Sequence, residues 1–579
     1  MLPRDFHKIP FLRHAGQHAI RDVAQNIIWY SLPGGWPLFL ESDPSDMMWF
    51  VRSGSLGAFK RNYEGQFELV GHIRSGEPVG EMAMIAGEPH SASVYAIRDT
   101  ELFGLTKQVF NRLIRSHPDL MQNLSRTILF RTKQTKRGRS DLSKVYSLLS
   151  SSPTIDIVGR AQKLAEEIRK YGKTCLVVTE SMAKQGAKWF DEIEHSHDVV
   201  MLTSQLGTGL WPQTCLRQAD RIWVFGRADA KPSTPLLPED SSPARDFKLV
   251  DIILIKDVGK KPVSKAKEWL DASGATRVLP WREGRIDDVQ SLARTIIGRS
   301  IGLVLSGGGA RAFAHIGAIR ALRDANIRFD FLGGTSMGGV IAACVAMGWK
   351  DEEIEERIWK AFVETNPLND YVLPVISFAS GRKVDERLQY QFGDIQIEDM
   401  QRPFFCVSSN LRTGTPMVHR TGPLVKALRA SIALPGILPP VIDGDDVLVD
   451  GAVINNFPTN VLIETHRGPN IGVDVTMQHA LIADDYRNPP GFLRWILTNG
   501  FHSAPPIAEL LMRAATINHD PSQARNNIDL LVCPEVGHVE LRDWRAFDTA
   551  VEAGYTATVK ILQDEEKAAM FASLRNFSN

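Results

Sequence analysis

The chain of 579 residues has no long hydrophobic run. Its apolar stretches stay short of the ~18 residues with which a helix crosses a bilayer. The first residues, MLPRDFHKIPFLRHAG, also lack the basic-then-apolar pattern of a secretory signal. These two absences argue against a membrane-spanning or secreted protein. The sequence therefore predicts a cytoplasmic protein whose membrane contact, where there is any, is peripheral and on the inner face of the membrane.

Cysteine is scarce, and charge of one sign is not in excess. The five cysteines are scattered singly, without a C-x-x-C pair. This excludes a disulfide framework and a zinc ribbon, so neither a metal site nor a cofactor is expected. Lys plus Arg and Asp plus Glu each number 67, which gives a formal net charge of zero. A balanced chain offers no broad electrostatic surface to nucleic acid, and no nucleic-acid partner is expected.

The pattern of the sequence divides the chain into three segments. Residues 1–145 contain short β-like runs between turns and end in helix-like, amphipathic stretches. Residues 153–298 alternate strands with helices, and TIDIVG (154–159) is expected as the first of these strands. Residues 299–579 show a second strand–helix alternation. The predicted fold class is multidomain, with a β-rich domain closed by helices, a middle α/β domain and a C-terminal α/β domain whose sheet is mostly parallel.

A glycine-rich turn opens the third segment. The stretch LVLSGGGARAFAHIGAIRAL (303–322) places Gly307, Gly308 and Gly309 between an apolar run and a helix-like pattern. Backbone N–H groups of such a turn bind anions. A dinucleotide site is disfavoured, because the sixth position of G-x-G-x-x-G is Ala312 and no acidic residue follows about 20 positions on after a second strand. A transient oxyanion is the other anion that the turn can hold.

A second glycine motif lies shortly after the first. In GGTSMGG (333–339), Gly334 and Gly338 flank Ser336 in a G-x-S-x-G match that follows an apolar run and precedes a helix-like stretch. A serine on a sharp strand-to-helix turn exposes its hydroxyl, and the glycines remove Cβ atoms that would collide there. Such a nucleophile needs donors for an oxyanion. The pairing of the two motifs therefore favours an oxyanion loop over a phosphate site.

The serine also needs a base, and the residues leave two candidates. One is Asp450 in VLVDGAVINNFP (447–458), at the end of an expected strand. The other is a histidine of an ordinary triad, His519 or His538, since both follow the aspartate in the order of α/β-hydrolases. His315 follows the glycine turn within a helix and is interpreted as a packing or capping residue.

Residues 301–475 resemble the patatin family of lipid acyl hydrolases. Three blocks of that family occur in order, namely SGGGAR (306–311), GTSMG (334–338) and DGA (450–452). The stretches SIALPGILPPV (431–441), DGAVINNFP (450–458) and DVVMLTSQLGTGLWPQTCLRQADRIWVFG (198–226) are similar to the neuropathy target esterase branch of the family.

The resemblance implies a Ser–Asp dyad that uses no histidine. It assigns the nucleophile to Ser336 and the base to Asp450, forms the oxyanion loop from the three glycines of 307–309, and gives Arg311 the role of ordering that loop. Ala312 stands where relatives often have a final glycine, a small change that casts little doubt. The implied reaction is hydrolysis of a fatty-acyl ester of a phospholipid or lysophospholipid.

The stretch PVGEMAMIAGEPHSASVYAI (78–97) resembles the phosphate-binding cassette of cyclic-nucleotide-binding domains, which implies a β-roll. Gly80, Glu81, His90 and Ser91 are its candidate nucleotide-binding residues. In the family, Glu accepts the ribose 2′-OH and Arg pairs with the cyclic phosphate. His90 stands at the Arg position, is mostly neutral at pH 7 and lacks the guanidinium fork. A cyclic nucleotide is a candidate ligand, and a docking or oligomerising module that has lost its ligand is the alternative.

The sequence as a whole predicts a serine lipid esterase of lysophospholipase or phospholipase type with an N-terminal regulatory module. Residues 433–441 and 488–501 are candidates for membrane contact, with core burial as an equal reading of the second stretch. The alternatives are a cyclic-nucleotide-sensing regulatory or scaffold protein with a vestigial hydrolase domain, and a soluble α/β-hydrolase that uses a histidine. Head-group preference, chain-length preference and oligomerisation stay open.

Overall fold

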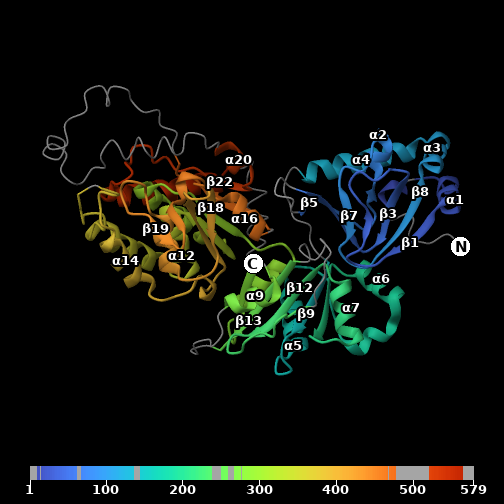
Figure 1. Ribbon diagram of the computed structural model, residues 1–579, viewed down its shortest axis with the longest axis horizontal. Coiled ribbons are helices and arrows are strands. Elements are labelled where there is room, and N and C mark those ends of the chain that lie inside the picture. The colour runs from blue at the N-terminus through green and yellow to red at the C-terminus, as the bar shows by residue number, and fades with distance from the viewer. Residues whose placement is uncertain are drawn as a thin grey trace. The chain divides into compact units, whose positions relative to one another are not determined.

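The computed structural model describes residues 9–12, 15–61, 67–135, 144–237, 249–257, 266–275, 277–373, 375–466, 468–476 and 521–564. The chain separates into two compact units, Met1–Ile297 and Gly298–Asn579, which are described one at a time (Figure 1). Within the ranges given above, no helix combines the length and the hydropathy that crossing a membrane requires.

The first unit begins with two antiparallel sheets of four strands each. Their strand orders are β1-β8-β3-β6 and β2-β7-β4-β5. The strands are β1 (Ile28–Leu32), β2 (Pro37–Phe39), β3 (Met47–Ser53), β4 (Ser55–Arg61), β5 (Phe67–Arg74), β6 (Pro78–Val79), β7 (Ser93–Ala96) and β8 (Thr100–Thr106). Alternate apolar side chains of these strands form a buried core between the sheets, in which Leu56, Val94 and Leu102 pack together.

Helices close this roll, as the sequence predicts. They are α1 (Gln17–Asn26), α2 (Glu81–Ala86), α3 (Lys107–Ser116) and α4 (Asp119–Thr135). The α3 helix begins where the hydroxyl of Thr106 accepts a hydrogen bond from the N–H of Val109 at 3.3 Å. Its apolar face buries Phe110 and Leu113 against the roll. The predicted fold class of this part, a β-roll with closing helices, is confirmed.

A parallel sheet of six strands completes the first unit, with the order β10-β11-β9-β12-β13-β14. Its strands are β9 (Val145–Ser150), β10 (Cys175–Val178), β11 (Val199–Gln205), β12 (Arg221–Arg227), β13 (Leu249–Lys256) and β14 (Arg277–Arg282). The helices are α5 (Ile157–Lys170), α6 (Gly186–Ser196), α7 (Leu210–Gln218), α9 (Ala266–Ser273) and α10 (Ile286–Ile296).

The prediction of a strand at residues 154–159 is wrong. The carboxylate of Asp156 accepts a hydrogen bond from the N–H of Gly159 at 2.9 Å and so caps α5, which begins at Ile157. The first strand is β9, ahead of the predicted segment. An isoleucine on either side of an aspartate alternates like a strand, but the cap offered by Asp156 favours a helix start.

A buried ionic cluster joins the roll to the six-stranded sheet within the first unit. Arg98, between β7 and β8, places its Nε 2.8 Å from Oδ1 of Asp220 and also pairs with Glu194 of α6. Asp220 accepts further hydrogen bonds from the Ser55 hydroxyl and the N–H of Val145, each at 3.0 Å. Buried charges persist where they are paired and hydrogen-bonded in this way. The two parts of the first unit therefore share a polar core element.

The second unit is built on a sheet of eight strands. Along its main path the order is β19-β20-β17-β16-β15-β21-β22, and β18 pairs with β17. The strands are β15 (Gly302–Leu305), β16 (Phe331–Thr335), β17 (Phe404–Asn410), β18 (Thr415–His419), β19 (Val441–Asp443), β20 (Asp446–Asp450), β21 (Asn470–Val473) and β22 (Leu530–Val532). The five strands from β17 to β22 along this path are parallel to one another, whereas β18, β19 and β20 are antiparallel to the strands they pair with. The predicted mostly parallel sheet is confirmed.

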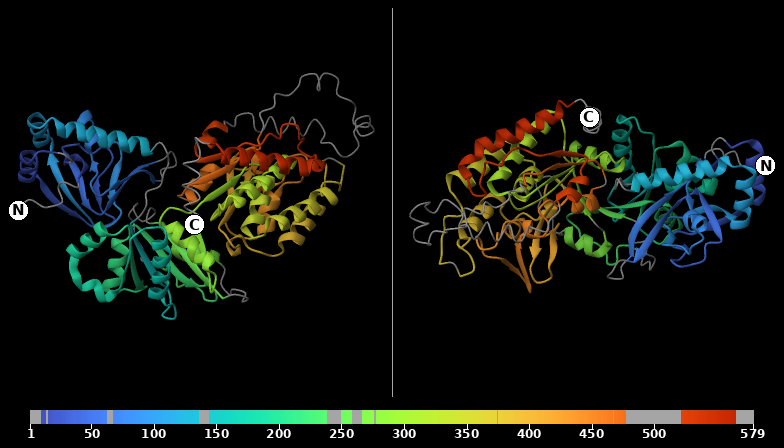
Figure 2. Two further views of the ribbon diagram at one scale, coloured as in Figure 1. Left: turned by 180° about the vertical axis from the view of Figure 1, so that it is seen from behind. Right: turned by 90° about the horizontal axis from the view of Figure 1, so that it is seen from above.

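Helices cover this sheet. They include α11 (Ala314–Asp324), α12 (Ser336–Ala346), α13 (Asp351–Ile358), α14 (Arg382–Phe392), α15 (Leu424–Ser431), α16 (Thr459–Thr465), α20 (Pro521–Asn526) and α21 (Phe547–Leu562). Every residue of α12 is buried, which fits its apolar sequence. The α21 helix, red in Figure 2, packs closely on α11. The absence of a side chain at Gly317 permits this approach, since a Cβ there would lie 1.8 Å from the carbonyl oxygen of Val551.

The topology of this sheet brings the two glycine motifs together. Strands β15 and β16 are parallel neighbours, and Leu305 pairs with Gly334. The carboxyl ends of parallel strands lie at one edge of the sheet, where ligands of α/β proteins bind. The glycine turn after β15 and Ser336 after β16 therefore meet at that edge.

Candidate active site

Ser336 lies at the turn between β16 and α12. Its φ is +54°, in the left-handed region that residues other than glycine seldom adopt. The turn is also tightly packed, since a Cβ at Gly338 would lie 2.4 Å from the carbonyl oxygen of Ser306, and one at Gly334 would lie 2.7 Å from the carbonyl carbon of Gly338. These features are those of a strained turn that presents a serine hydroxyl at the edge of a sheet.

Asp450 ends β20 and reaches Ser336 across the sheet. The Ser336 hydroxyl donates a hydrogen bond of 2.6 Å to Oδ2 of Asp450, and the N–H of Ala452 donates one of 2.8 Å to Oδ1. The carboxylate is fully buried, and burial raises its pKa to about 7, although the hydrogen bonds from Ser336 and Ala452 act in the opposite direction. The side chain therefore has the proton affinity of a general base that works near neutral pH.

The structure favours the aspartate over the candidate histidines as the group beside Ser336. His538 is exposed in the segment after β22, whereas Ser336 and Asp450 are buried. His519 lies outside the described residues. Among the residues that the structure describes, no histidine is hydrogen-bonded to Ser336 or Asp450. Ser336 and Asp450 are thus hydrogen-bonded to each other directly.

The three glycines have different surroundings in the turn. Gly307 donates its N–H to the carbonyl oxygen of Asn456 at 3.1 Å, so this amide is occupied. A Cβ at Gly307 would lie 3.1 Å from Cβ of Ser336, so glycine here permits the close approach of the loop to the serine. Gly309 begins a 3-10 helix, η4 (Gly309–Phe313), after Gly308. The first N–H groups of a helix have no partner within it, which leaves the amides of Gly308 and Gly309 as candidate oxyanion donors.

The end of the turn is fixed to the segment before α21. Gly309 has a φ of +57°, and a Cβ there would lie 2.2 Å from the carbonyl oxygen of Leu541. That oxygen accepts the N–H of Ala310 at 2.9 Å, and the Arg311 Nε donates to the carbonyl oxygen of Val539 at 2.7 Å. Arg311 thus connects the end of the glycine turn to the segment before α21.

His315 supports the turn from its first helix. It is buried in α11, and its Nε2 donates to the carbonyl oxygen of Ser306 at 2.8 Å. Burial lowers the pKa of His315 to about 4, so the ring stays neutral at pH 7. Its hydrogen bond fixes the carbonyl group of Ser306, the residue before the three glycines.

Two further residues support the site, and the sequence patterns did not identify either of them. Ser431 accepts the N–H of Ser336 at 2.9 Å and donates its hydroxyl proton to the carbonyl oxygen of Val407 at 2.7 Å. Asn456 donates from Nδ2 to the Gly307 carbonyl oxygen at 3.3 Å. Both lie in blocks that the resemblance marks, SIALPGILPPV and DGAVINNFP, but no spacing rule assigns them a role in the site.

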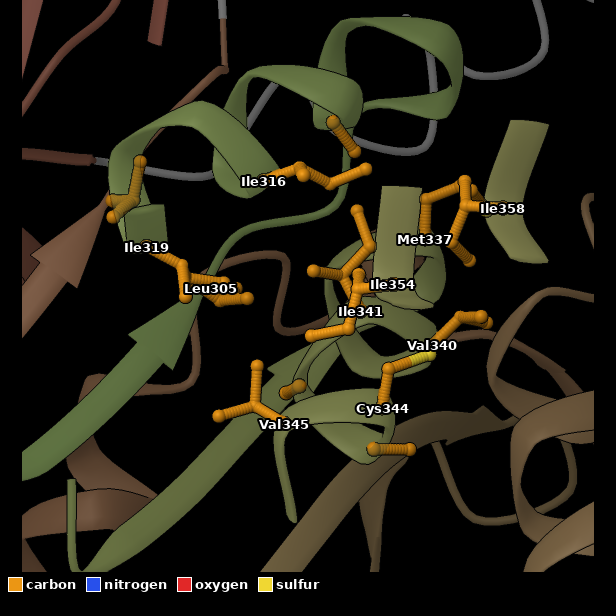
Figure 3. Packing of buried hydrophobic residues seen from close by; sticks show 14 of the residues in the cluster. Leu305, Ile316, Ile319, Met337, Val340, Ile341, Cys344, Val345, Ile354 and Ile358 are labelled. Carbon is orange, nitrogen blue, oxygen red and sulfur yellow. The ribbon is translucent and has the colours of Figure 1, made fainter. Parts of the chain in front are cut away.

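An apolar cavity of about 820 Å³, part of it open to solvent, begins at Gly309 and Ser336. From the serine it follows α12 past Met337, Val340 and Cys344, whose side chains project from one region of the helix in Figure 3. Since a helix rises about 1.5 Å per residue, Cys344 lies about 12 Å from Ser336 along the axis. The lining of the cavity is therefore mostly apolar beside the serine.

Charged residues of one sign line the same cavity. Arg357, Arg387 and Arg542 contribute to its wall, and no acidic side chain does so among the described residues. Arg542 is buried and donates from Nη2 to the hydroxyl of Tyr371 at 3.1 Å. Its buried Nε has no hydrogen-bond acceptor within the described part of the chain. A buried guanidinium of this kind suits an anionic group of a ligand.

Of the two stretches that are candidates for membrane contact, the structure describes residues 433–441. Within residues 433–441, Leu434 and Leu438 line the cavity, and the carbonyl oxygen of Ala433 accepts the N–H of Asp450 at 2.9 Å. Two side chains of this stretch are thus part of the cavity wall. Residues 488–501 lie outside the described residues.

Some of the candidate nucleotide-binding residues of the roll contact other side chains or the backbone of the roll. The His90 ring stacks on Phe39 with centroids 3.6 Å apart and lies against Gly80. Burial lowers the pKa of His90, so a neutral imidazole occupies the position where the family places a cation. Glu81 is buried at the start of α2, and Ser91 is exposed. The described residues contain no group of His, Cys, Asp and Glu that could hold a metal ion.

Comparison with known proteins gives matches for both ends of the chain. Residues 303–463 match the patatin-like phospholipase family, and residues 30–117 match the cyclic nucleotide-binding domain. An uncharacterized NTE family protein of Mycobacterium tuberculosis is 28% identical over 575 residues, which cover 96% of this chain and 95% of that protein.

Patatin-like phospholipase domain-containing protein 6 of Homo sapiens is 27% identical over 86% of this chain, and the match covers 42% of the human protein. Among solved structures, the catabolite activator protein of Thermus thermophilus matches 28% of this chain and 71% of its own, with 22% identity and a TM-score of 0.21. The chain thus carries a patatin-like phospholipase domain behind a cyclic nucleotide-binding domain, and it is similar to an NTE family protein over nearly its whole length.

Proposed function

We propose that this protein is a serine esterase that hydrolyses the fatty-acyl ester of a phospholipid or lysophospholipid through Ser336 and Asp450. The observation that carries the proposal is the 2.6 Å hydrogen bond from the Ser336 hydroxyl to the buried Asp450 carboxylate. A base of pKa about 7 that accepts a hydrogen bond from a serine on a strained turn is an arrangement for nucleophilic catalysis.

The reaction proceeds in two halves. Asp450 accepts the Ser336 proton while the serine oxygen attacks the ester carbonyl, and the negative charge forms on the carbonyl oxygen. The N–H groups of Gly308 and Gly309 receive that oxyanion, together with the N–H of Met337, which lies in the first turn of α12. Asp450 then returns the proton to the leaving alcohol. Water then attacks the acyl-enzyme and gives its proton to Asp450. The bond from the acyl carbon to the Ser336 oxygen breaks, Asp450 returns the proton to that oxygen, and the fatty acid leaves.

The cavity supports a lipid as substrate. Its apolar wall along α12 accommodates the acyl chain. Arg387 and Arg542 fit a phosphate better than a neutral head group, whereas Arg357 is already paired with Glu353 at 2.9 Å. Arg542 is the best placed of them, because its guanidinium is buried and has an unused donor. We infer that phosphate-containing esters are hydrolysed in preference to monoacylglycerols of the same chain length, and mass spectrometry of the released fatty acid tests this preference.

The roll is proposed as a regulatory module. A neutral His90 stacked on Phe39 offers a cyclic phosphate no charged fork. The geometry therefore favours regulation through protein contacts of the roll over recognition of a cyclic phosphate at this position.

Replacing Val340 tests whether the acyl chain follows α12. Because Val340 lines the cavity one helical turn from Ser336, Val340→Phe shortens the space available to the chain. We expect the ratio of palmitoyl-ester to butyryl-ester turnover to fall about tenfold or more. Val340→Ala is the matched control and should leave the ratio unchanged or raise it. Equal losses on both esters in Val340→Phe would mean that the chain takes another path.

The pH dependence of the reaction should report Asp450. The base must be ionised in the free enzyme, and its pKa is about 7. With an uncharged butyryl ester, kcat/KM is expected to fall about tenfold per pH unit below about pH 7. Circular dichroism at each pH shows whether the fold persists. A midpoint near the ordinary aspartate value of ~3.9 would contradict the role of a desolvated carboxylate.

A further inference from the structure

Four large apolar side chains stand exposed in one short stretch of the second unit. The exposed fractions are 45% for Val372, 89% for Leu373, 91% for Val375 and 69% for Ile376. These four residues are called the apolar loop below. Single exposed apolar residues are common on protein surfaces, but four within five positions form a patch that marks contact with a partner.

The base of the apolar loop is fixed to the wall of the active-site cavity. The hydroxyl of Tyr371, just before the loop, accepts a hydrogen bond from Arg542, which lines the cavity. Just after the loop, Phe378 donates its N–H to the carbonyl oxygen of Gly436 at 2.8 Å, within the stretch that also supplies Leu434 and Leu438 to the cavity wall. Both ends of the loop are thus attached to residues that surround the substrate space.

The residues that follow carry cationic and aromatic side chains. Arg382, Arg387 and Tyr390 are exposed on α14, which begins six residues after Ile376, and Lys383 is half-buried. The acidic side chains of this helix are partly neutralised, since Asp385 pairs with Arg429 at 2.7 Å and Glu386 lies 3.8 Å from Arg382. Apolar side chains beside arginine, lysine and tyrosine are typical of segments that lie at the boundary between lipid headgroups and acyl chains.

We propose that the apolar loop inserts into a lipid surface and so brings the cavity mouth to its substrate. The proposal rests on the proposed function for the identity of that substrate. A phospholipid leaves a membrane at a high cost in apolar exposure, and a loop buried in the membrane beside the cavity lets its acyl chain pass from one apolar environment to another. A protein partner or a second copy of the chain would have no need of a position at the cavity.

Vesicle sedimentation with the full-length protein tests the loop. Vesicles of ether-linked phosphatidylcholine and phosphatidylglycerol contain no ester that the protein can cleave. The double variant Leu373→Ser/Val375→Ser is expected to bind them at least about tenfold more weakly than the wild type, because two side chains lose their apolar burial. The matched control is Leu210→Ser/Ile286→Ser, which removes two exposed apolar side chains from the first unit and should leave binding unchanged.

Turnover separates this proposal from the proposed function. With the apolar-loop variant, hydrolysis of vesicle-borne lysophospholipid should fall about tenfold, while hydrolysis of a monomeric butyryl ester stays as in the wild type. The loop's role would be overturned if the variant bound vesicles as tightly as the wild type. It would also be overturned if the wild type were a dimer and the variant a monomer that still bound vesicles, because the loop would then be a contact between two copies of the chain. A wild type that binds vesicles but cleaves neither ester would instead refute the esterase function and leave the docking surface standing.

Discussion

Replacing Ser336 with alanine is expected to lower kcat for ester hydrolysis by about 10⁴- to 10⁶-fold. The alanine removes the nucleophile but keeps the backbone turn, since both residues have a Cβ and meet similar strain at a φ of +54°. The hydrogen bond to Asp450 is lost, yet the carboxylate keeps the N–H of Ala452. Fatty-acid release from a lysophospholipid measures the loss, and thermal unfolding shows that the variant remains folded.

The double variant Ser336→Ala/Asp450→Asn sharpens this test. When two residues act in the same catalytic step, replacing the second costs little further activity once the first has been replaced. The double variant should therefore have about the same kcat as the less active of the two single variants. Ser204→Ala, in the first unit, is a control for handling and purity. Turnover of Ser336→Ala within about tenfold of the wild type would contradict the serine mechanism, because the reaction would then proceed without the proposed nucleophile.

Replacing Asp450 with asparagine is expected to abolish activity and, at alkaline pH, to stabilise the fold. The folded-state pKa is about 7, well above the value of ~3.9 in an unfolded chain. The protonated carboxyl therefore favours the fold fully below about pH 4, and this contribution is lost as the pH rises through about 7. Above that pH the wild type holds a buried, ionised carboxylate, at a cost of up to about 4 kcal/mol from a shift of roughly three pKa units.

Asparagine has nearly the same shape and no charge to desolvate. In urea titrations that follow the unfolding of the second unit, Asp450→Asn should gain up to about 4 kcal/mol at about pH 8.5 and little at about pH 4. Asp445→Asn is the matched control, because Asp445 is exposed and lies immediately before β20. This variant should show no such pH-dependent gain in stability. A loss of stability at alkaline pH in Asp450→Asn would mean that the ionised carboxylate contributes more through its hydrogen bonds than burial costs it.

The serine turn was predictable because its requirements are local. A strand, a turn without Cβ atoms on either side of Ser336, and a helix follow one another in sequence, and each leaves its own pattern. The mostly parallel sheet was predictable for a similar reason, from the alternation of apolar strands with helices. The carboxyl-end rule then places the glycine turn beside Ser336, as the pairing of Leu305 with Gly334 shows.

The partner of the serine was not fixed by the residues alone. Asp450 lies 114 positions from Ser336, and their contact depends on the antiparallel pairing of β20 with β17, in which Asp450 faces Ser408. No local pattern encodes that pairing, so a histidine stayed open until the resemblance removed it. The oxygen of Ser431 and the amide of Asn456 were missed for the same reason, since their roles are contacts between segments distant in sequence.

The apolar loop shows a different limit of sequence reasoning. A short apolar run with valine and isoleucine has the composition of a buried strand. In the structure, these residues form no strand of the sheet and are exposed. Composition indicates that such a run prefers an apolar environment, but whether the fold or a partner supplies that environment depends on the rest of the chain.

Arg98 has a practical consequence for anyone who divides the chain. Its guanidinium belongs to the roll, whereas Asp220 and Glu194 belong to the six-stranded sheet. A cut near residue 145 would leave the two carboxylates on one fragment and the arginine that pairs with them on the other. Fragments of this kind tend to misfold or aggregate, because an unpaired charge in an apolar interior is costly. Ligand measurements on the roll should therefore use the first unit whole, ending at Ile297.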